Sequence, residues 1–396
     1  MKVGYLAGLT PYGLFSVYRN LRAGLEGQGI ELRWIGHGQW TADICKTPAW
    51  ESEREHGEVV GPDLTNNDDI GKALVRHLGE QRYDAVFINP PQWELAMNVA
   101  RYLPSSIVRI MFVLQMGAGT YRTCRGIRDY VHATVGLSPR IRDDLVNDWG
   151  FDANRTSVGG EIDLAPYRDL PPRPASEQLR VIYFGRMYDA QKGVFTLPRI
   201  FKRLADVRAH LSIVGDGPDL DKLKVRCQPL GDRVSFMPVV QPRDIPVLLS
   251  QQDVFIFPTR LEGLGYVLLE ALAAGCVPVC SRIRGVTDYV VRDGQTGILF
   301  PVDDAAAAAQ GIRRLAQDPQ LLQRLRSAGM DDCRRRFDAV AMGPRWAQML
   351  RTLQERPPAI ATPLPLEQWN YPPQFSPTWR RWIPERLKRV IRARIA

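Results

Sequence analysis

The sequence lacks the cysteine and histidine patterns that hold metal ions or cross-link small secreted domains. Its six cysteines include no C-x-x-C pair and have no clustered histidine partners. Neither a zinc site nor a disulfide framework is therefore indicated. We expect the cysteines to be reduced packing residues, and the protein to be cytoplasmic.

Long apolar runs and dinucleotide motifs are absent as well. No stretch approaches the roughly 18 uninterrupted apolar residues that a membrane span needs, and the apolar part of MKVGYLAGLT is short for a signal peptide. No G-x-G-x-x-G opens a helix after the first predicted strand of either half, which argues against a dinucleotide-dependent oxidoreductase. The five histidines stand in no recognisable catalytic setting.

What the sequence does contain is a strand–helix alternation that occurs twice. The chain has 396 residues, 45% of them hydrophobic, which is enough for two α/β domains. Short β-rich runs separated by amphipathic segments occupy 2–8, 31–36, 84–90, 108–115 and 133–138, and again 181–186, 210–217, 233–238, 253–258, 276–281 and 297–301. The proline-rich stretch 168–180 between the two sets predicts a linker. The alternation predicts two parallel sheets covered by helices.

Polar residues follow several predicted strands of the second half. Arg186 ends one strand, Lys192 comes six residues later, and the segments 216–218 and 259–265 follow two further strands. Ligands of open parallel sheets bind outside the carboxyl ends of the strands. Cations neutralise phosphate and glycines let the backbone approach it, so this pattern predicts a diphosphate site. The alternative is that the cations are solvated surface charges and the glycines only form turns.

Glu270 lies within an otherwise apolar predicted helix that ends near Gly275. The apolar face of this helix comprises Leu268, Leu269, Leu272 and Ala273. A carboxylate in such a helix is costly unless something hydrogen-bonds to it. A ligand hydroxyl is one candidate, and an internal arginine or a carboxylate that reaches solvent is the alternative.

Four segments together resemble a known family. In order, they are GRMYDAQKG, IVGDGP, DVFIFPTRLEGLGYVLLEALAAGCVPVCS and GVTDYVVRDGQTGILFPVDD. In this order and spacing they resemble the C-terminal half of the retaining GT-B glycosyltransferases of family four, the glycosyl transferases group 1. The match runs from about 180 to 345 and includes the family's glutamate pair, Glu262 and Glu270. The N-terminal half resembles the family in its strand–helix rhythm and in the loop GLTPYGLF.

This resemblance implies an α/β GT-B fold, in which two Rossmann-like doubly wound domains face each other across a cleft. We expect an acceptor-side domain over 1–170 and a nucleotide-sugar-binding domain over 171–340. A crossover helix over 341–356 would return to the first domain, followed by a proline- and aromatic-rich linker and a basic tail helix over 357–396.

The resemblance also implies roles for particular residues. Arg186, Lys192 and Glu262 would be catalytic residues around the donor diphosphate and sugar. The other implied donor-binding residues are Gly13, Gly263, Leu264, Gly265 and, at the ribose hydroxyls, Glu270. Fixed cations and N–H groups can stabilise the departing diphosphate, so we expect no metal and no cofactor apart from the donor substrate itself. The D-x-D formed by Asp219 and Asp221 is interpreted as the start of a helix, where acids are favoured.

The sequence departs from the family pattern in the first half. Many members have a histidine after the strand equivalent to 108–115, where this chain has Gln115, which we assign as a candidate sugar contact. The usual Asn-Gly before the interdomain linker appears as GGEID, which keeps only Asp163. His132 lies in a strand-like run and is interpreted as structural.

The last nineteen residues, 378–396, carry seven basic residues against one acid. Apolar residues recur there at spacings of three and four, which predicts an amphipathic helix with cations around its apolar stripe. That composition is typical of a helix in an anionic membrane interface; the alternative is packing on the protein. The predicted membrane contacts are Trp379, Arg380, Arg381, Trp382, Lys388 and Arg389.

The sequence therefore predicts a metal-independent, hexosyltransferase-type enzyme. It would move a sugar with retention from a nucleotide diphosphate-sugar to a saccharide or lipid-linked saccharide acceptor, in cell-surface polysaccharide or glycolipid synthesis. We expect it to be peripheral on the inner face of the cytoplasmic membrane and to bind no nucleic acid. The alternatives are a sugar-nucleotide epimerase or phosphorylase of the same fold and a non-catalytic nucleotide-sugar-binding protein.

Overall fold

The computed structural model describes residues 1–6, 15–89 and 94–375, and its chain forms two compact units. Unit 1 comprises residues 1–160 and 339–396, and unit 2 comprises residues 161–338. The first boundary thus falls ten residues before the expected one at 170, and the second lies two residues before 340. Backbone contacts explain the earlier start of unit 2: Ile162 donates its N–H to Phe337 O at 2.8 Å and pairs with Asp338 in an isolated bridge. Residues 161–170 therefore begin unit 2.

Unit 1 is built on a seven-stranded sheet with the order β3-β2-β1-β4-β5-β6-β7. The strands are β1 (Lys2–Leu6), β2 (Glu31–His37), β3 (Gly57–Val60), β4 (Ala85–Ile88), β5 (Val108–Val113), β6 (Ala133–Gly136) and β7 (Thr156–Val158). All of the neighbouring pairs run parallel. Because the order reverses between β1 and β4, the sheet is doubly wound as in Rossmann folds. This confirms the predicted sheet type, although β3 and β7 were not predicted.

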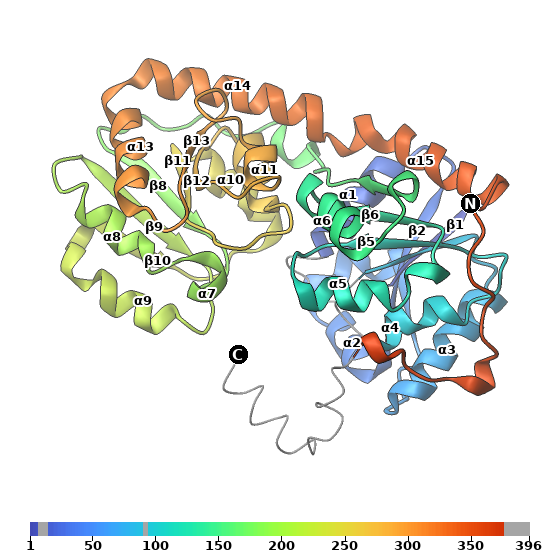
Figure 1. Ribbon diagram of the computed structural model, residues 1–396. Helices are drawn as coiled ribbons and strands as arrows, with labels where there is room; N and C mark the ends of the chain where they lie inside the picture. Colours follow the sequence, from blue (N-terminus) through green and yellow to red (C-terminus); the bar gives the residue numbers. More distant parts are fainter. Residues whose placement is uncertain (7–14, 90–93, 376–396) are drawn as a thin grey trace. The chain divides into compact units, whose positions relative to one another are not determined.

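Helices cover the unit 1 sheet (Figure 1). They are α1 (Phe15–Leu25), α2 (Gly38–Cys45), α3 (Asn67–Glu80), α4 (Glu94–Asn98), α5 (Ala118–Arg125), α6 (Pro139–Trp149) and, from the far end of the chain, α15 (Ala339–Glu355). Two glycines let α1 and α15 touch through their backbones: a Cβ on Gly343 would lie 1.8 Å from Gly24 O. Trp346 of α15 packs against Phe112 in the sheet, with ring centroids 5.6 Å apart. This helix is thus integral to unit 1.

A fully buried Arg109 lies within β5, among apolar neighbours. Its Nη2 donates to Pro104 O at 2.9 Å, and its backbone N–H donates to His132 Nδ1 at 3.0 Å. Burial, and secondly the charge of Arg109, lowers the pKa of His132 to about 4. His132 is therefore a neutral packing residue, which confirms its structural interpretation.

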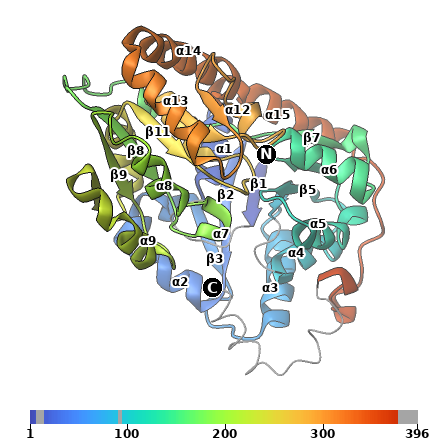
Figure 2. The same ribbon diagram turned by 60° about the vertical axis from the view of Figure 1, so that its left-hand side comes forward.

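Residues 356–375, which we call the strap, lie along unit 1 past α3 (Figures 1 and 2). The Trp369 ring stacks on Tyr102 with centroids 4.6 Å apart, and its Nε1 donates to Asp68 Oδ1 at 3.1 Å. A Cβ on Gly71 would lie 2.2 Å from the Trp369 ring, so only glycine permits this approach. The strap ends with Phe375, which is buried. These aromatic side chains pack on unit 1, so the segment predicted as a linker is also a packed part of that unit.

Unit 2 repeats the same topology with six parallel strands in the order β10-β9-β8-β11-β12-β13. The strands are β8 (Leu179–Phe184), β9 (Ala209–Val214), β10 (Val234–Met237), β11 (Val254–Phe257), β12 (Val277–Ser281) and β13 (Ile298–Phe300). Buried apolar residues dominate β8, β11 and β12, as expected for a parallel sheet covered on both faces. Every predicted strand of this half is confirmed.

The helices of unit 2 alternate with its strands. They are α7 (Asp189–Lys192), α8 (Thr196–Lys202), α9 (Leu220–Cys227), α10 (Ile245–Ser250), α11 (Tyr266–Ala273), α12 (Thr287–Val290), α13 (Ala305–Gln317) and α14 (Pro319–Phe337). The strand order reverses between β8 and β11, so the loops after these two strands diverge into different helices at one edge of the sheet. That edge is the expected ligand position. In the part of the chain that the structure describes, no helix has the length and apolarity needed to cross a bilayer.

Candidate active site

The candidate site of unit 2 lies where β8 and β11 end. Arg186 and α7 follow β8, whereas the loop from Thr259 to Gly265 follows β11. Gly193, at the end of α7, has a φ of +61°, and a Cβ there would lie 2.1 Å from Pro258 O. A side chain at this position would push α7 away from β11, so the glycine permits the two loops to meet.

Lys192 and Glu262 form an ion pair across these two loops. Their side chains are 17% and 10% exposed, respectively, so the pair is partly shielded from water. Thr259 Oγ1 lies 3.3 Å from Glu262 Oε1 and donates to it, and the Lys192 Nζ lies 5.6 Å from the centroid of the Phe257 ring. The structure therefore brings together two residues that are seventy positions apart in the sequence, as the motif pattern predicts.

Arg186 lies at the same edge but is exposed. Its guanidinium lies 5.8 Å from the centroid of the Tyr188 ring. Within residues 1–6, 15–89 and 94–375, no acidic side chain forms an ion pair with it. Arg186 is thus a cation whose charge is available to an anionic ligand at the carboxyl edge of the sheet.

The turn from Gly263 to Gly265 leads directly into α11. Gly265 has a φ of +83°, which L-residues rarely adopt, and precedes the first residue of the helix. Leu264 is 1% exposed and anchors the turn in the core of unit 2. Backbone N–H groups at the start of a helix have no partner within the helix and favour anions. The turn therefore places such groups beside the Lys192–Glu262 pair.

Glu270 lies on α11, in the apolar surroundings that the sequence predicts. Burial raises the pKa of its carboxyl group to about 7. Tyr167, from the segment that begins unit 2, is a titratable neighbour of Glu270. The pKa of Tyr167 is raised mainly by burial and secondly by the charge of Glu270. Neither an arginine nor any other described side chain forms a hydrogen bond with the Glu270 carboxylate. This carboxylate can accept hydrogen bonds from a ligand.

The D-x-D motif stands at the start of helix α9, as predicted, but the Asp219 side chain has a further role. Asp219 does occupy the N-cap position of α9, but its side chain does not cap that helix. Its carboxylate instead accepts the N–H of Asp189 at 2.8 Å, at the start of α7. Asp221 is exposed and lies 3.9 Å from Lys224. Asp219 thus holds the loop that carries Lys192.

Sequence reasoning missed Arg260, which connects three loops of this edge. Its guanidinium pairs with Asp189 on α7 at 3.1 Å and with Asp303, after β13, at 2.7 Å. The residue stands two positions before Glu262, inside a motif in which the glutamates and glycines carry the family resemblance. No spacing rule would have identified it, because both of its partners come from other loops.

The candidate residues of unit 1 form a less complete set. Gln115 is exposed between β5 and α5, two residues before Gly117, whose φ is +132°. The side chain of Asp163, now the third residue of unit 2, accepts the N–H of Ala165 at 2.9 Å. Gly13 lies outside the described residues, and so do the six predicted membrane contacts, Trp379, Arg380, Arg381, Trp382, Lys388 and Arg389.

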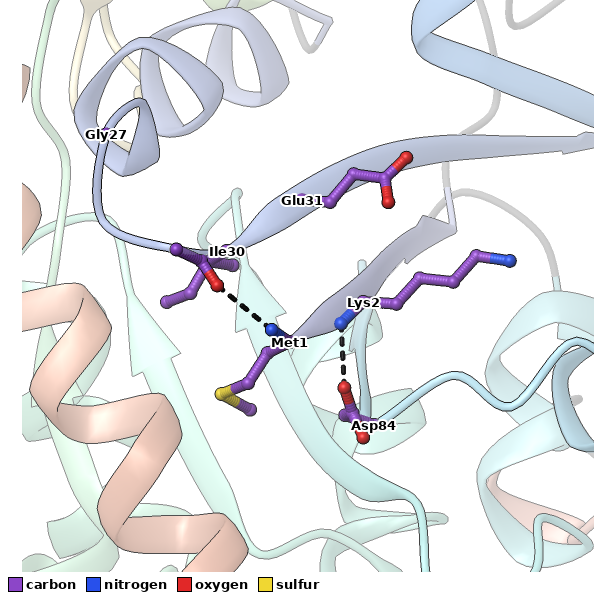
Figure 3. Close-up of a pocket in the computed structure, with 7 residues that line it drawn as sticks. Met1, Lys2, Gly27, Ile30, Glu31 and Asp84 are labelled. Carbon is purple, nitrogen blue, oxygen red and sulfur yellow. Dashed lines mark hydrogen bonds between the residues drawn. The ribbon is translucent and has the colours of Figure 1, made fainter.

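One hollow of unit 1 lies at the opposite edge of its sheet. It has a volume of about 570 Å³ and is lined by Met1, Lys2, Gly27, Gly29, Ile30, Glu31 and Asp84. Figure 3 shows Lys2 and Glu31 at the amino ends of β1 and β2 and Asp84 just before β4, where the Lys2 N–H donates to Asp84 Oδ2 at 2.7 Å. This hollow is therefore not part of the candidate site.

Comparison with protein families agrees with the geometry of unit 2. Residues 178–318 match the model of the family described as "Glycosyl transferases group 1". This stretch contains Arg186, Lys192, Glu262 and Glu270. It lies entirely within unit 2.

Similar proteins include two curated bacterial transferases. Phosphatidyl-myo-inositol mannosyltransferase of Mycolicibacterium smegmatis is 29% identical over 266 residues, covering 63% of this chain and 66% of that protein. The lipopolysaccharide core biosynthesis glycosyltransferase LpsD of Rhizobium meliloti is 25% identical over 355 residues, which is 86% of this chain and 96% of that protein. The chain spans only 57–65% of the length of several other curated relatives.

Solved structures resemble the whole fold. HepE of Anabaena, crystallised with UDP and glucose, superposes with a TM-score of 0.72 at 17% identity, covering 89% of this chain and all of that one. At this identity the likeness concerns the fold alone. It confirms the predicted GT-B class of two Rossmann-like α/β domains.

Proposed function

We propose that this chain, whose residues 178–318 match the group 1 glycosyl transferases, moves a sugar, with retention, from a nucleotide diphosphate-sugar to a saccharide acceptor. The observation that carries the proposal is the Lys192–Glu262 ion pair at the edge where β8 and β11 diverge, with the exposed Arg186 directly after β8. This is the edge of a doubly wound sheet at which ligands bind. Glu270 adds an unpaired carboxylate on the helix that follows.

The chemistry suits the departure of a nucleoside diphosphate. When the bond between sugar and phosphate breaks, negative charge accumulates on the diphosphate. Arg186, Lys192 and the N–H groups at the start of α11 would stabilise that charge, because they are already positioned when it develops. These groups act without a metal ion, so we propose a metal-independent reaction.

Glu262 and Glu270 would contact other parts of the donor. Glu262 is held between Lys192 and Thr259, so its carboxylate is oriented to accept a hydroxyl of the donor sugar. Glu270 would accept the ribose hydroxyls, and the gain of these hydrogen bonds would offset the desolvation that raises its pKa to about 7. The two glutamates are therefore proposed to bind the two ends of the donor, the sugar and the nucleoside, and not to exchange a proton.

Donor binding tests this proposal most directly. A thermal-shift panel of UDP-, GDP-, ADP- and CDP-sugars should reveal one base that raises the unfolding temperature, since a ligand at about 100 times its Kd stabilises by about 2.7 kcal/mol. The same shift should be lost in Lys192→Ala and in Glu270→Gln. If no nucleotide-sugar shifts the unfolding temperature and none is hydrolysed, the proposal is wrong.

Product analysis separates the enzyme classes. With the donor identified, mass spectrometry of the products should show a nucleoside diphosphate and a glycosylated acceptor, and the anomeric configuration should be that of the donor. An isomer of unchanged mass would indicate an epimerase. Donor binding without transfer to any acceptor would indicate a binding protein.

The acceptor is proposed from the chemistry named for the relatives and from the tail. One relative is named for an inositol phospholipid and another for lipopolysaccharide core synthesis. We therefore propose a saccharide or lipid-linked acceptor, in cell-surface polysaccharide or glycolipid synthesis. The excess of basic residues over 378–396 would hold the enzyme on the inner face of the cytoplasmic membrane, at about 1 kcal/mol per cation.

A vesicle assay tests the membrane part separately. The full chain should sediment with vesicles that contain anionic lipid and should be released by salt. Deletion of residues 378–396 should abolish sedimentation and leave the donor thermal shift unchanged. Equal sedimentation of the two chains would remove the proposed membrane role of the tail.

A further inference from the structure

Arg260 is the most highly connected side chain at the carboxyl edge of unit 2. Its Nη1 lies 3.1 Å from Asp189 Oδ2 and also donates to the Asp189 carbonyl. Its Nε donates to both carboxylate oxygens of Asp303, at 2.8 and 2.9 Å. One guanidinium therefore joins the loops that follow β8, β11 and β13. Arginine suits this position because its planar fork of donors binds carboxylates with fixed geometry.

The backbone around Arg260 makes the same connection. The N–H groups of Arg260 and Leu261 both donate to Gln191 O, at 2.8 and 3.2 Å. Thr259 Oγ1 also lies 3.1 Å from the same carbonyl oxygen. Gln191 immediately precedes Lys192, so the loop of Glu262 is bound to the residue beside its ion-pair partner. These contacts leave the two catalytic candidates little freedom to separate.

Asp303 is held in a conformation that costs energy. Its φ is +64°, and only one other non-glycine residue of the described chain, Arg82, has a positive φ. Non-glycine residues in this region persist where surrounding contacts hold them. The Arg260 guanidinium, beside the Asp303 carboxylate, holds the pKa of that carboxyl below its usual range. The pair thus stays ionised at neutral pH.

We infer that Arg260 is a positioning residue that sets the geometry of the Lys192–Glu262 pair. The inference rests on the proposed function, in which that pair faces the donor sugar and diphosphate. Arg260 touches neither substrate nor reacting atoms in this arrangement; it acts through α7. A displacement of about 1 Å in a catalytic group can lower a rate by about two orders of magnitude. Loss of the clamp should therefore lower kcat while the donor still binds.

The experiment compares Arg260→Gln with a matched pair elsewhere in unit 2. Arg313 offers the control, because it binds Asp206 through two nitrogens, at 2.7 and 3.3 Å, and donates to Arg203 O at 2.8 Å. With a saturating donor, Arg260→Gln should lower kcat about tenfold or more and change the donor KM less than threefold. Arg313→Gln should change neither by more than about twofold. Arg260→Lys keeps the positive charge but lacks the planar set of guanidinium donors, so it should recover only part of the kcat lost in Arg260→Gln.

A second readout does not depend on turnover. The Lys192 amine can be acylated by an excess of a lysine-reactive ester and quantified by mass spectrometry, with Lys224 as the exposed reference. Arg260→Gln should increase the acylation rate of Lys192 several-fold relative to Lys224, because the pair with Glu262 is loosened. Asp303→Asn should act in the same direction, and the double variant should add little to Arg260→Gln.

The outcomes separate the inference from the proposed function. Unchanged kcat and unchanged Lys192 acylation in Arg260→Gln would overturn the positioning role. Equal losses in Arg260→Gln and Arg313→Gln would overturn it too, because both would then reflect general stability. If the wild-type chain turns over no nucleotide-sugar, the proposed function fails, while the acylation experiment still tests the clamp.

Discussion

The carboxyl edges of the two sheets differ although their strand orders are alike. In unit 2, the loops after β8, β11 and β13 are joined by ion pairs and shared carbonyl oxygens around Arg260 and Gln191. In unit 1, the described loop after β5 places Gln115 in solvent, and within the described residues a Cβ on Gly117 or Gly119 would meet no other segment within 4 Å. One edge is braced, and the other, in its described part, is open.

This difference suits the proposed transfer reaction, in which unit 2 would bind the donor and unit 1 the acceptor. A diphosphate presents the same charges in every nucleotide-sugar, so fixed cations can be braced for it. Acceptors vary in shape, and open glycine-containing loops can vary without disturbing the donor edge. Chemical constraint and sequence signal coincide in this molecule, because every segment that carries the family resemblance in detail lies in unit 2, the unit with the braced edge.

Removal of Lys192 should have the largest effect. Lys192→Ala deletes a partly shielded cation and leaves Glu262 without its ion-pair partner. We expect donor turnover to fall about ten- to over a hundredfold, since a contact to a charged group contributes about 1.5–3 kcal/mol. Steady-state hydrolysis or transfer of the active donor measures it, with Lys224→Ala as the exposed control. Equal rates for both variants would break the assignment of the braced edge to the donor.

Glu270 should make stability depend on pH. Its folded-state pKa of about 7 lies above the ordinary value of 4.5 for a glutamate, so the folded chain binds a proton that the unfolded chain has released. The free energy of unfolding therefore falls as pH rises through this interval. The advantage of Glu270→Gln over wild type should grow by about 2 kcal/mol between pH 5 and pH 8. Urea unfolding at the two pH values measures this, and a constant difference would contradict it.

Substitution of Trp369 should show that the strap stabilises unit 1, the unit whose described carboxyl edge is open. Trp369→Ala removes the stack on Tyr102, the bond to Asp68 and the packing over Gly71. We expect a loss of about 1–2 kcal/mol in the free energy of unfolding, measured by urea unfolding with hydrogen exchange in α3. Trp40, a residue that is 49% exposed, provides the control substitution to alanine. An equal loss in both variants would mean that the strap adds no particular stability.

Gln115 should have the smallest effect. Gln115→Ala removes one exposed amide, worth about 0.5–1.5 kcal/mol if it bonds a sugar hydroxyl. We expect the acceptor KM or the transfer rate to change by about two- to tenfold, with donor hydrolysis unaltered. A change in donor hydrolysis instead would place this residue at the donor and weaken the contrast between the two edges.

Most of the fold follows from local patterns in the sequence. Every strand of unit 2 was predicted, because its strands are near-continuous apolar runs bounded by turn residues. The short β3 and β7 were missed, since GEVV and TSV carry too few apolar residues to form a recognisable run. The packing of the strap does not follow from local patterns, because its prolines and aromatic residues show no periodicity. The residues of unit 1 that it contacts lie about 270 positions away in the sequence.

The sequence alone determined the class of sheet, and it indicated the edge proposed for the donor, with Lys192, Glu262 and Glu270 as its candidate residues. These depend on local periodicity and on residues that must directly follow a strand. Only the tertiary structure decided that Lys192 pairs with Glu262, that Asp219 holds α7 and that Arg260 joins three loops. The reason is physical: an ion pair depends on distance in space, and the spacing of residues along the chain does not record which loops will meet.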